Sequence, residues 1–182
     1  MKTTKFTEDI ILVEDFFSPQ ECEHYILWSE QQGYEEAKVQ TSSGQVMMKN
    51  LRNNSRIMFS DEVLAEKIWK KIQPFCIPEI GIAKAFGLNE MFRFYKYEVG
   101  QKFKRHIDGS YQRNEQEFSL YTLLIYLNEG FEGGKTTFDN LIIHPKIGSA
   151  LIFKHQLKHE GKEILSGEKY VLRTDIMYRL KE

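Results

Sequence analysis

Short runs of β-branched and aromatic residues, separated by Gly, Asn or Pro, occupy the chain from Met91 onward. Runs of this kind are typical of β-strands bounded by turns. They are MFRFYKYEV, FSLYTLLIYL, NLIIH, SALIFK and KYVLRTDIMYRL. Because each short strand must bury at least one face, the pattern predicts a mainly β fold, a sandwich or barrel with helices packed outside it.

The first half of the chain has mostly helical spacing and is expected to support the β-structure. Ser18-Pro19-Gln20-Glu21 has the form of a capping box with proline at the first helical position, which predicts a helix through about Gln31. A second helix is predicted from Asp61 to Ile72, capped by Ser60. Its apolar face would comprise Val63, Leu64, Ile68, Trp69 and Ile72.

Overall charge and cysteine content exclude several classes of protein. Lys and Arg number 25 against 26 Asp and Glu, so no global positive field favours nucleic acid or an anionic membrane as a partner. The opening segment is broken by acidic residues, unlike a signal peptide, and no apolar run reaches membrane-spanning length, which predicts a cytoplasmic protein. Cys22 and Cys76 lie far apart without a paired motif, so neither a disulfide scaffold nor a cysteine zinc site is expected.

His106-Ile107-Asp108 places an imidazole and a carboxylate two residues apart, on one face of an extended strand. An isolated pattern of this length is more often a surface His and Asp at a strand end. A third candidate, His159, follows about fifty residues later. Two histidines and one carboxylate leave positions open on a ferrous ion, whereas a structural zinc site closes all four positions.

The remaining histidines are weaker candidates for the third ligand. His24 falls in the N-terminal helix, and His144 precedes a proline in a turn. His155 is the serious alternative, because it stands four residues before His159 and the two would form a helical zinc pair. The residue after His155 is Gln156 rather than the glutamate of that motif, and the flanking runs favour strand over helix. His159 is therefore preferred.

Five motifs in the last ninety residues resemble the prolyl and lysyl hydroxylase branch of the Fe(II)- and 2-oxoglutarate-dependent oxygenases. In chain order they are Tyr97 and Gly100 leading into His106-Ile107-Asp108; Tyr126-Leu127-Asn128 followed by Gly133-Gly134-Lys135-Thr136-Thr137-Phe138; Pro145-Lys146-Ile147-Gly148; and His159 followed by Gly167 and Lys169. Together, in this order and with compatible spacings, these motifs are far more specific than any one of them.

The resemblance implies a single domain over residues 1–182, with helical support mainly in 1–85 and a catalytic core mainly in 86–182. The core would be a double-stranded β-helix, or cupin-like jelly roll. The cofactors implied are Fe(II), 2-oxoglutarate and O2, with ascorbate as a candidate reductant. The reaction implied is hydroxylation of an unactivated C–H group, coupled to conversion of 2-oxoglutarate to succinate and CO2.

By the same resemblance Lys169 would bind the distal carboxylate of 2-oxoglutarate, and Tyr97 and Tyr126 would donate hydrogen bonds to it; ordinary core tyrosines are the alternative. Arg173 lies on the same strand face as Lys169 but about 13 Å further along. It would contact an anionic group of the substrate, act as a second 2-oxoglutarate contact, or form a buried ion pair with a neighbour such as Asp175.

The substrate is less constrained than the chemistry. A prolyl or other residue of a peptide and a small molecule both remain candidates. Lys102, Lys104 and Arg105 would attract an anionic substrate or simply protect a strand edge, and the loop 49–56 is either a substrate lid or a surface loop. The alternatives to a hydroxylase are a non-catalytic metal-binding jelly roll and a nucleic-acid demethylase of the same superfamily.

Overall fold

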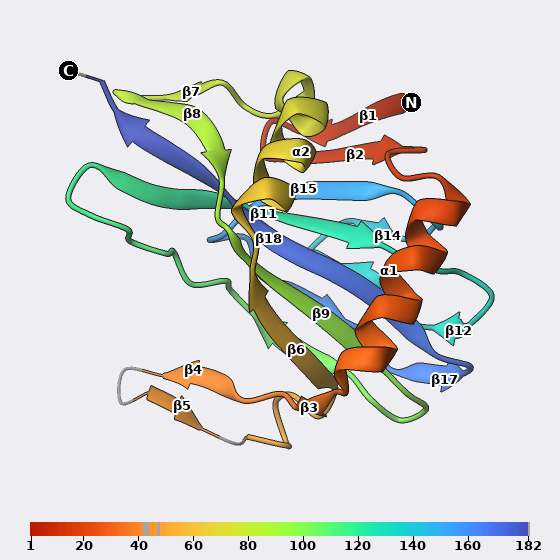
Figure 1. The fold of residues 1–182 in the computed structure, drawn as a ribbon. Helices are drawn as coiled ribbons and strands as arrows, with labels where there is room; N and C mark the ends of the chain where they lie inside the picture. Colours follow the sequence, from red (N-terminus) through yellow and green to blue (C-terminus); the bar gives the residue numbers. More distant parts are fainter. Residues whose placement is uncertain (42–43, 47, 182) are drawn as a thin grey trace.

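The computed structural model describes residues 1–41, 44–46 and 48–181 (Figure 1). These residues form a mainly β fold with two α-helices, α1 (Pro19–Gln32) and α2 (Glu62–Ile72), and a 3-10 turn over Gln73–Phe75. The strands before residue 100 are β1 (Lys2–Thr7), β2 (Ile10–Glu14), β3 (Glu35–Glu36), β4 (Val39–Thr41), β5 (Gly44–Val46), β6 (Ser55–Ser60), β7 (Glu79–Ile80), β8 (Ala83–Leu88) and β9 (Met91–Tyr97). The later strands are β10 (Phe103–His106), β11 (Glu117–Tyr126), β12 (Glu132–Gly133), β13 (Thr136–Thr137), β14 (Ile142–Ile143), β15 (Ala150–Lys154), β16 (His159–Gly161), β17 (Ile164–Ser166) and β18 (Lys169–Leu180). The predicted fold class is confirmed.

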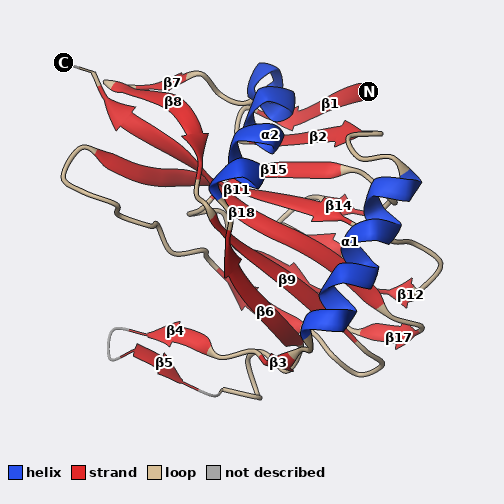
Figure 2. Ribbon diagram, in the orientation of Figure 1, coloured by secondary structure: helices blue, strands red, loops and turns tan. Residues whose placement is uncertain are grey.

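One large antiparallel sheet organises the molecule. Its strands follow the order β1-β2-β15-β11-β18-β9-β6-β3, with β8 also paired to β18 and β7 paired to β8. A second sheet, in the order β10-β16-β13-β14, carries the metal-site motifs. Figure 2 shows both helices lying across one face of the large sheet. The second sheet packs on the opposite face, as the jelly-roll prediction requires.

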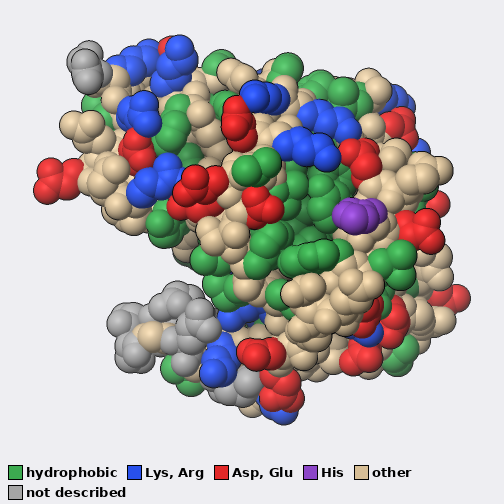
Figure 3. Space-filling model, in the orientation of Figure 1, with side chains coloured by type: hydrophobic (Ala, Val, Ile, Leu, Met, Phe, Trp, Pro, Cys, Tyr) green, Lys and Arg blue, Asp and Glu red, His purple; other side chains and the backbone are tan. Residues whose placement is uncertain are grey.

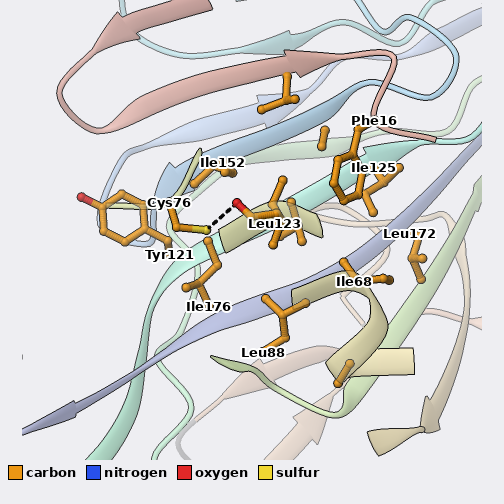
Figure 4. Close-up of a cluster of buried hydrophobic side chains, with 14 of the residues drawn as sticks. Phe16, Ile68, Cys76, Leu88, Tyr121, Leu123, Ile125, Ile152, Leu172 and Ile176 are labelled. Carbon is orange, nitrogen blue, oxygen red and sulfur yellow. Dashed lines mark hydrogen bonds between the residues drawn. The ribbon is translucent and has the colours of Figure 1, made fainter. Parts of the chain in front are cut away.

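Alternation along the strands gives the large sheet a hydrophobic core on each face. On β9, Phe94 joins the cluster under the helices, whereas its neighbour Tyr95 joins the cluster facing the second sheet. Leu172 and Val171 divide in the same way on β18. Figure 4 shows the helix-side cluster, which the α2 residue Ile68 enters from above the sheet. The helices therefore seal one face and leave the other for the site.

Both cysteines are buried and unpaired, as expected from their separation. The Cys76 thiol donates to the Ile72 carbonyl at 3.4 Å, just after the end of α2 (Figure 4). Burial raises the pKa of Cys22 to about 11 and that of Cys76 to about 12, so both are protonated at neutral pH. They act as small core residues rather than as metal ligands.

The capping box at the start of α1 forms as predicted. The Ser18 hydroxyl accepts from the Glu21 N–H at 3.1 Å, and the Glu21 carboxylate accepts from the Ser18 N–H at 2.8 Å. The helix extends to Gln32, and Gly33 follows with a positive φ of 79°. The sequence thus located this helix at both ends.

The start of α2 differs from the prediction by one residue. The cap is Asp61, whose carboxylate accepts from the Leu64 N–H at 2.9 Å, and Ser60 is the last residue of β6. Val63 is 79% exposed, so it does not belong to the buried face. The buried residues of α2 are Ala65, Ile68 and Ile72. The prediction missed the strand that runs directly into this cap.

Both helices lie within residues 1–85, but this half of the chain is less helical than its spacing indicated, because it also contributes strands. β1, β2, β3 and β6 extend the large sheet, and β2 pairs directly with β15 of the second half. β1 is largely solvent-exposed and β3 has two residues, so neither has the apolar run by which strands are recognised. β2 is short, but four of its five residues are apolar and it is mostly buried, so its sequence did carry a strand signal. None of the helices in the described residues is long and apolar enough to cross a membrane.

Candidate metal centre

The three predicted ligands come together at one end of the second sheet. His106 ends β10 and His159 begins β16, and the two residues are direct partners in the antiparallel pairing of these strands. Asp108 follows two residues after β10. Each residue offers one ligand atom, and these atoms all lie within 4.8 Å of one another. Strand pairing therefore explains how residues fifty positions apart meet.

Backbone hydrogen bonds fix which nitrogen of each imidazole faces the centre. His106 Nδ1 lies 2.7 Å from the Lys104 carbonyl oxygen, and His159 Nδ1 lies 2.9 Å from that of Leu157. Because a carbonyl only accepts, each Nδ1 carries the proton and each Nε2 presents a free lone pair. Both Nε2 atoms lie 3.7 Å from an oxygen of Asp108. The two rings are thus oriented for metal binding.

Aromatic packing holds the same rings in place. The Phe103 ring stacks on His106 with centroids 3.5 Å apart and an interplanar angle of 12°. The Phe153 ring meets His159 edge-on at 4.5 Å, and the Phe138 ring lies 5.9 Å from it. These apolar neighbours limit ring rotation and restrict water on that side.

The charges of the three groups suit a divalent metal. Burial by itself raises the pKa of Asp108, but Arg173 and the two imidazoles hold it well below its usual range. Burial is the main cause that lowers the pKa of His159 to about 4. At neutral pH the site therefore offers an ionised carboxylate and a neutral His159. This donor set fits a ferrous ion with positions left open for other ligands. In residues 1–41, 44–46 and 48–181 no fourth His, Cys, Asp or Glu joins it.

The other three histidines lie away from this centre. His24 and His144 are exposed. His155 is 2% exposed but is not part of the three-residue group. It lies in the turn after β15, with its backbone carbonyl accepting from the Asp108 N–H at 3.0 Å. The geometry thus agrees with the preference for His159 over His155, and gives His155 a place behind the carboxylate.

A directed chain of hydrogen bonds supports Asp108, and sequence reasoning did not find it. Thr122 Oγ1 donates to Asp108 at 2.6 Å and lies 2.9 Å from His155 Nδ1. His155 Nε2 lies 2.9 Å from Ser119 Oγ, which accepts from the Tyr111 N–H at 2.8 Å. Because the ionised Asp108 only accepts, Thr122 must use its proton there, so His155 donates from Nδ1 and accepts at Nε2. The sequence signal was two hydroxyl residues, Ser119 and Thr122, within the mostly apolar run of β11.

Lys169, the predicted partner of the distal carboxylate, lies in a cavity that opens onto the three ligands. It is 4% exposed, and its ammonium donates to the Gly134 carbonyl at 2.5 Å. The rings of Tyr97 and Tyr126 lie 5.5 and 5.4 Å from it. Tyr126 also shares a 2.7 Å hydrogen bond with Thr136. The three residues predicted to contact the co-substrate, Lys169, Tyr97 and Tyr126, therefore line one cavity, and Arg173 also lines it.

No carboxylate of the described chain pairs with Lys169, and burial lowers its pKa to about 7. A buried cation without an anion is costly unless a ligand supplies one. The carbonyl that accepts from it belongs to Gly134, which has a positive φ of 61°, and a Cβ there would lie 2.6 Å from the Ile164 side chain. The glycine motif thus lets the loop approach closely enough to hold the ammonium.

Arg173 occupies a buried ion-pair network. Its Nη2 lies 3.2 Å from Asp108 and 3.2 Å from Asp175, and its Nη1 donates to the Tyr95 hydroxyl at 3.3 Å. The pair with Asp175 was one of the predicted alternatives, and the pair with Asp108 was not foreseen. Arg173 thus bridges the carboxylates of Asp108 and Asp175. Its contacts differ from those of Lys169, which lies at the start of the same strand.

Comparisons with known proteins place this geometry among known relatives. Residues 92–174 match the 2OG-Fe(II) oxygenase superfamily. A putative prolyl 4-hydroxylase of Acanthamoeba polyphaga mimivirus is 30% identical over 145 residues, which cover 68% of this chain and 57% of that protein. The chain spans about half the length of the curated relatives it matches.

Two solved structures share the fold. The viral collagen prolyl hydroxylase of Paramecium Bursaria Chlorella virus-1, in complex with 2OG, has a TM-score of 0.63 and 21% identity, covering 95% of this chain and 97% of that one. A Trichoplax adhaerens prolyl hydroxylase, in complex with a hypoxia inducible factor peptide fragment, has a TM-score of 0.73 and 19% identity, covering 93% and 84%. At these identities the likeness shows the double-stranded β-helix fold.

Proposed function

The chain belongs to the 2OG-Fe(II) oxygenase superfamily, and on that premise we propose that it is an Fe(II)- and 2-oxoglutarate-dependent hydroxylase. His106, Asp108 and His159 would hold the metal, and Lys169 would bind the distal carboxylate of 2-oxoglutarate. Bound together, Fe(II) and 2-oxoglutarate allow O2 to hydroxylate a C–H group, with succinate and CO2 as co-products.

One observation carries the proposal: a buried cation without an anion shares a cavity with three converging metal ligands. A metal-binding protein with no use for a dicarboxylate has no reason to bury Lys169 there, where its charge raises the free energy of the folded state. The non-catalytic reading therefore leaves this residue unexplained, whereas 2-oxoglutarate supplies the missing negative charge.

The chain's own residues have three tasks in this reaction. The backbone carbonyls behind His106 and His159 orient the rings, and Arg173 and Thr122 hold the Asp108 carboxylate. The apolar walls around the ligands limit water near the reacting centre.

The substrate class is also a proposal. The matched relatives bear names of prolyl 4-hydroxylases, and the Trichoplax structure holds a peptide. We therefore propose peptides containing proline as the first candidates, with free amino acids and other small molecules as the second group.

The test is succinate release that depends on both Fe(II) and 2-oxoglutarate, with mass spectrometry to detect a substrate that gains one oxygen. Stoichiometric succinate and hydroxylated product are expected. Binding of metal and 2-oxoglutarate without succinate formation across the substrate panel would favour the non-catalytic alternative. Hydroxylation confined to methylated oligonucleotides would favour the demethylase.

Asp108→Ala tests the metal assignment. Loss of a support around a metal ligand costs about 10- to 100-fold in affinity, so loss of the ligand itself should cost more than about 100-fold and stop coupled turnover. Arg173 keeps Asp175 as a partner, so the fold should persist. The exposed Asp139→Ala is the matched control. Normal 2-oxoglutarate turnover by Asp108→Ala would show that this carboxylate is not a ligand.

A further inference from the structure

Two cavities meet at His106 and Asp108, two of the three proposed metal ligands. The first contains Lys169 and is the place of 2-oxoglutarate in the proposed function. The second is a groove of about 420 Å³ that opens outward between the loop before β6 and the segment after β10. Both are lined by Tyr95, Phe103, His106, Asp108 and Arg173. A molecule in the groove would therefore lie against His106 and Asp108, next to the cavity that contains Lys169.

Cationic side chains outnumber acidic ones in this groove. The cationic residues are Lys38, Arg52, Arg56, Arg93 and Arg173, and the acidic ones are Asp108 and Asp175. Both acids already have partners, since Arg93 and Arg173 pair with Asp175 at 3.3 and 3.2 Å and Arg173 pairs with Asp108. The groove thus has an excess of positive charge next to the reacting centre.

Arg52 is a buried residue of this groove whose charge lacks a counterpart within the described residues. It is 4% exposed, yet no carboxylate in the described part of the chain lies within ion-pair distance of it, and its Nη2 is buried without a hydrogen-bond partner. Its Nε donates to Asn54 at 2.7 Å. The guanidinium lies 4.4 Å from the Tyr95 ring centroid and 4.6 Å from that of Phe103. Stacking offsets part of the cost of burial but leaves a donor unused.

The position of Arg52 relative to the metal ligands is fixed. The Phe103 ring separates its guanidinium from the His106 imidazole, on which that ring stacks at 3.5 Å. The loop that carries Arg52 is tied to β10, because the Lys104 N–H donates to the Leu51 carbonyl at 2.8 Å. Arg52 itself forms a β-bridge with Phe103. This part of the loop is a wall of the groove, rather than the free lid or plain surface loop considered from the sequence.

The ionisable groups nearby respond to the same positive field. Burial raises the pKa of Tyr95, but Arg173, Arg52 and Arg93 outweigh burial and bring it down to about 8. The pKa of Arg56 is lowered by burial and by its like-charged neighbours Arg52, Arg93 and Arg173. An anion that entered the groove would relieve this repulsion.

We infer that this groove binds an anionic group of the substrate, a carboxylate or a phosphate, which accepts a hydrogen bond from Arg52 and so sets the target C–H beside the metal ligands. The inference rests on the proposed function and names its substrate class: an acid whose anionic group lies a few bonds from the hydroxylated carbon. A peptide with an acidic residue next to the target residue and a free carboxylic acid share this chemistry.

The first test uses matched small probes on the unaltered protein loaded with Mn(II) and saturated with 2-oxoglutarate, so that the Lys169 cavity is filled. Inorganic phosphate, benzoate and neutral benzamide are titrated by calorimetry. Phosphate and benzoate are expected to bind in competition with each other, and benzamide at least about 10-fold more weakly. Equal binding of benzoate and benzamide would overturn the inference.

Variants then locate the site. Arg52→Gln should weaken benzoate and phosphate binding roughly 10- to 100-fold, and Arg52→Lys should restore part of it. Arg179→Gln removes an exposed arginine paired with Glu117 and should change neither affinity. Unchanged anion binding in Arg52→Gln would overturn the inference, and the wild-type probe pair still decides if this variant does not fold.

The two proposals fail separately. Mn(II) and 2-oxoglutarate affinities are measured in the same samples, and their absence would contradict the proposed function. Titrations of benzoate and phosphate in the absence of metal, with wild type and Arg52→Gln, still test whether Arg52 binds the anion. In the substrate screen, acidic peptides and their amidated counterparts form matched pairs, and a preference for the amidated member would also count against the anion site.

Discussion

Lys169 illustrates what sequence and structure each contribute at the scale of a residue. Its position ten residues after His159 matches the basic residue of the family motif, so the resemblance predicts that it binds the co-substrate. Only the structure shows that its ammonium is held by the Gly134 carbonyl between two tyrosine rings, with burial lowering its pKa to about 7. If Lys169 binds the co-substrate as proposed, that value would make the binding depend on pH near neutrality.

The affinity for 2-oxoglutarate should fall as pH rises above about 7. The folded-state pKa of Lys169 is depressed, so the empty cavity holds an ammonium below about pH 7 and a neutral amine above it. Binding the distal carboxylate above that pH must take up a proton. The dissociation constant should therefore be flat below about pH 7 and rise about tenfold per pH unit above it. Calorimetry in buffers of different ionisation enthalpy measures both the affinity and the proton uptake.

Lys169→Arg is the control for this dependence. A guanidinium stays charged over the whole range, so the rise of the dissociation constant above pH 7 should disappear even if the affinity itself is lower. A rise of the same steepness in Lys169→Arg would assign the titration to another group.

Arg173 shows where reasoning from sequence ended. Its strand face followed from its distance to Lys169, and Asp175 was foreseen as a partner. The contact with Asp108 depends on how β18 lies against the segment after β10, which no local pattern specifies. The sequence did not single out Arg52 either. A basic residue in a loop gives no local sign that it is buried, yet Arg52 is only 4% exposed.

At the scale of elements, β11 supports the metal site from behind. Thr122 on this strand connects Asp108 to His155 in the turn after β15. Thr122→Val keeps the shape of the side chain but removes the donor to Asp108 and the acceptor for His155. Metal affinity should fall about 10- to 100-fold. Thr122→Ser should restore most of it. Titration with Mn(II) followed by electron paramagnetic resonance measures the affinity of both variants. An unchanged affinity in Thr122→Val would show that the hydrogen bonds from Thr122 to Asp108 and His155 do not support metal binding.

The junction of β6 and α2 gives a second test at this scale. Asp61→Ala removes the side chain that caps the Leu64 N–H and should lower the free energy of unfolding by about 1 kcal/mol. Ser60→Ala, one residue earlier, should have no measurable effect, because Ser60 is part of β6. Urea denaturation measures the free energy of unfolding of both variants. A larger decrease in Ser60→Ala than in Asp61→Ala would show that Ser60 is the cap, as the sequence predicted.

The elements that sequence located share a strong local signal. The β18 run is twelve residues of mostly buried strand, and α1 has both a capping box and a following glycine. The strands that sequence missed, such as β1 and β6, are stabilised by pairing within the large sheet rather than by their own apolar pattern. Tertiary pairing decided their conformation.

At the scale of the molecule, surface charge bears on the choice of partner. Basic and acidic side chains are interspersed around a hydrophobic area on the face seen in Figure 3. The concentrated positive charge lies instead in the groove beside the metal ligands. This distribution favours recognition of a single anionic group over the extended contact that a nucleic-acid backbone requires, and the absence of nucleic-acid binding stays a prediction.

The two cavities, the hydrogen bonds behind Asp108 and the hydrophobic core all involve strands of one large sheet. Binding of metal or 2-oxoglutarate should therefore stabilise the whole fold. β18 alone supplies Lys169 to one cavity and Arg173 to both. A ligand that binds only the folded state at 100 times its dissociation constant raises the free energy of unfolding by about 2.7 kcal/mol. For a chain of this size that corresponds to a rise in Tm of roughly 5–10 °C.

Thermal unfolding with Mn(II) alone, 2-oxoglutarate alone and both together measures this coupling. The largest rise is expected with both, because 2-oxoglutarate would bind the metal as well as Lys169. Lys169→Met should keep the rise due to Mn(II) and lose most of the further rise due to 2-oxoglutarate, whereas Asp108→Ala should lose both. A full response to 2-oxoglutarate in Lys169→Met would mean that the co-substrate binds elsewhere.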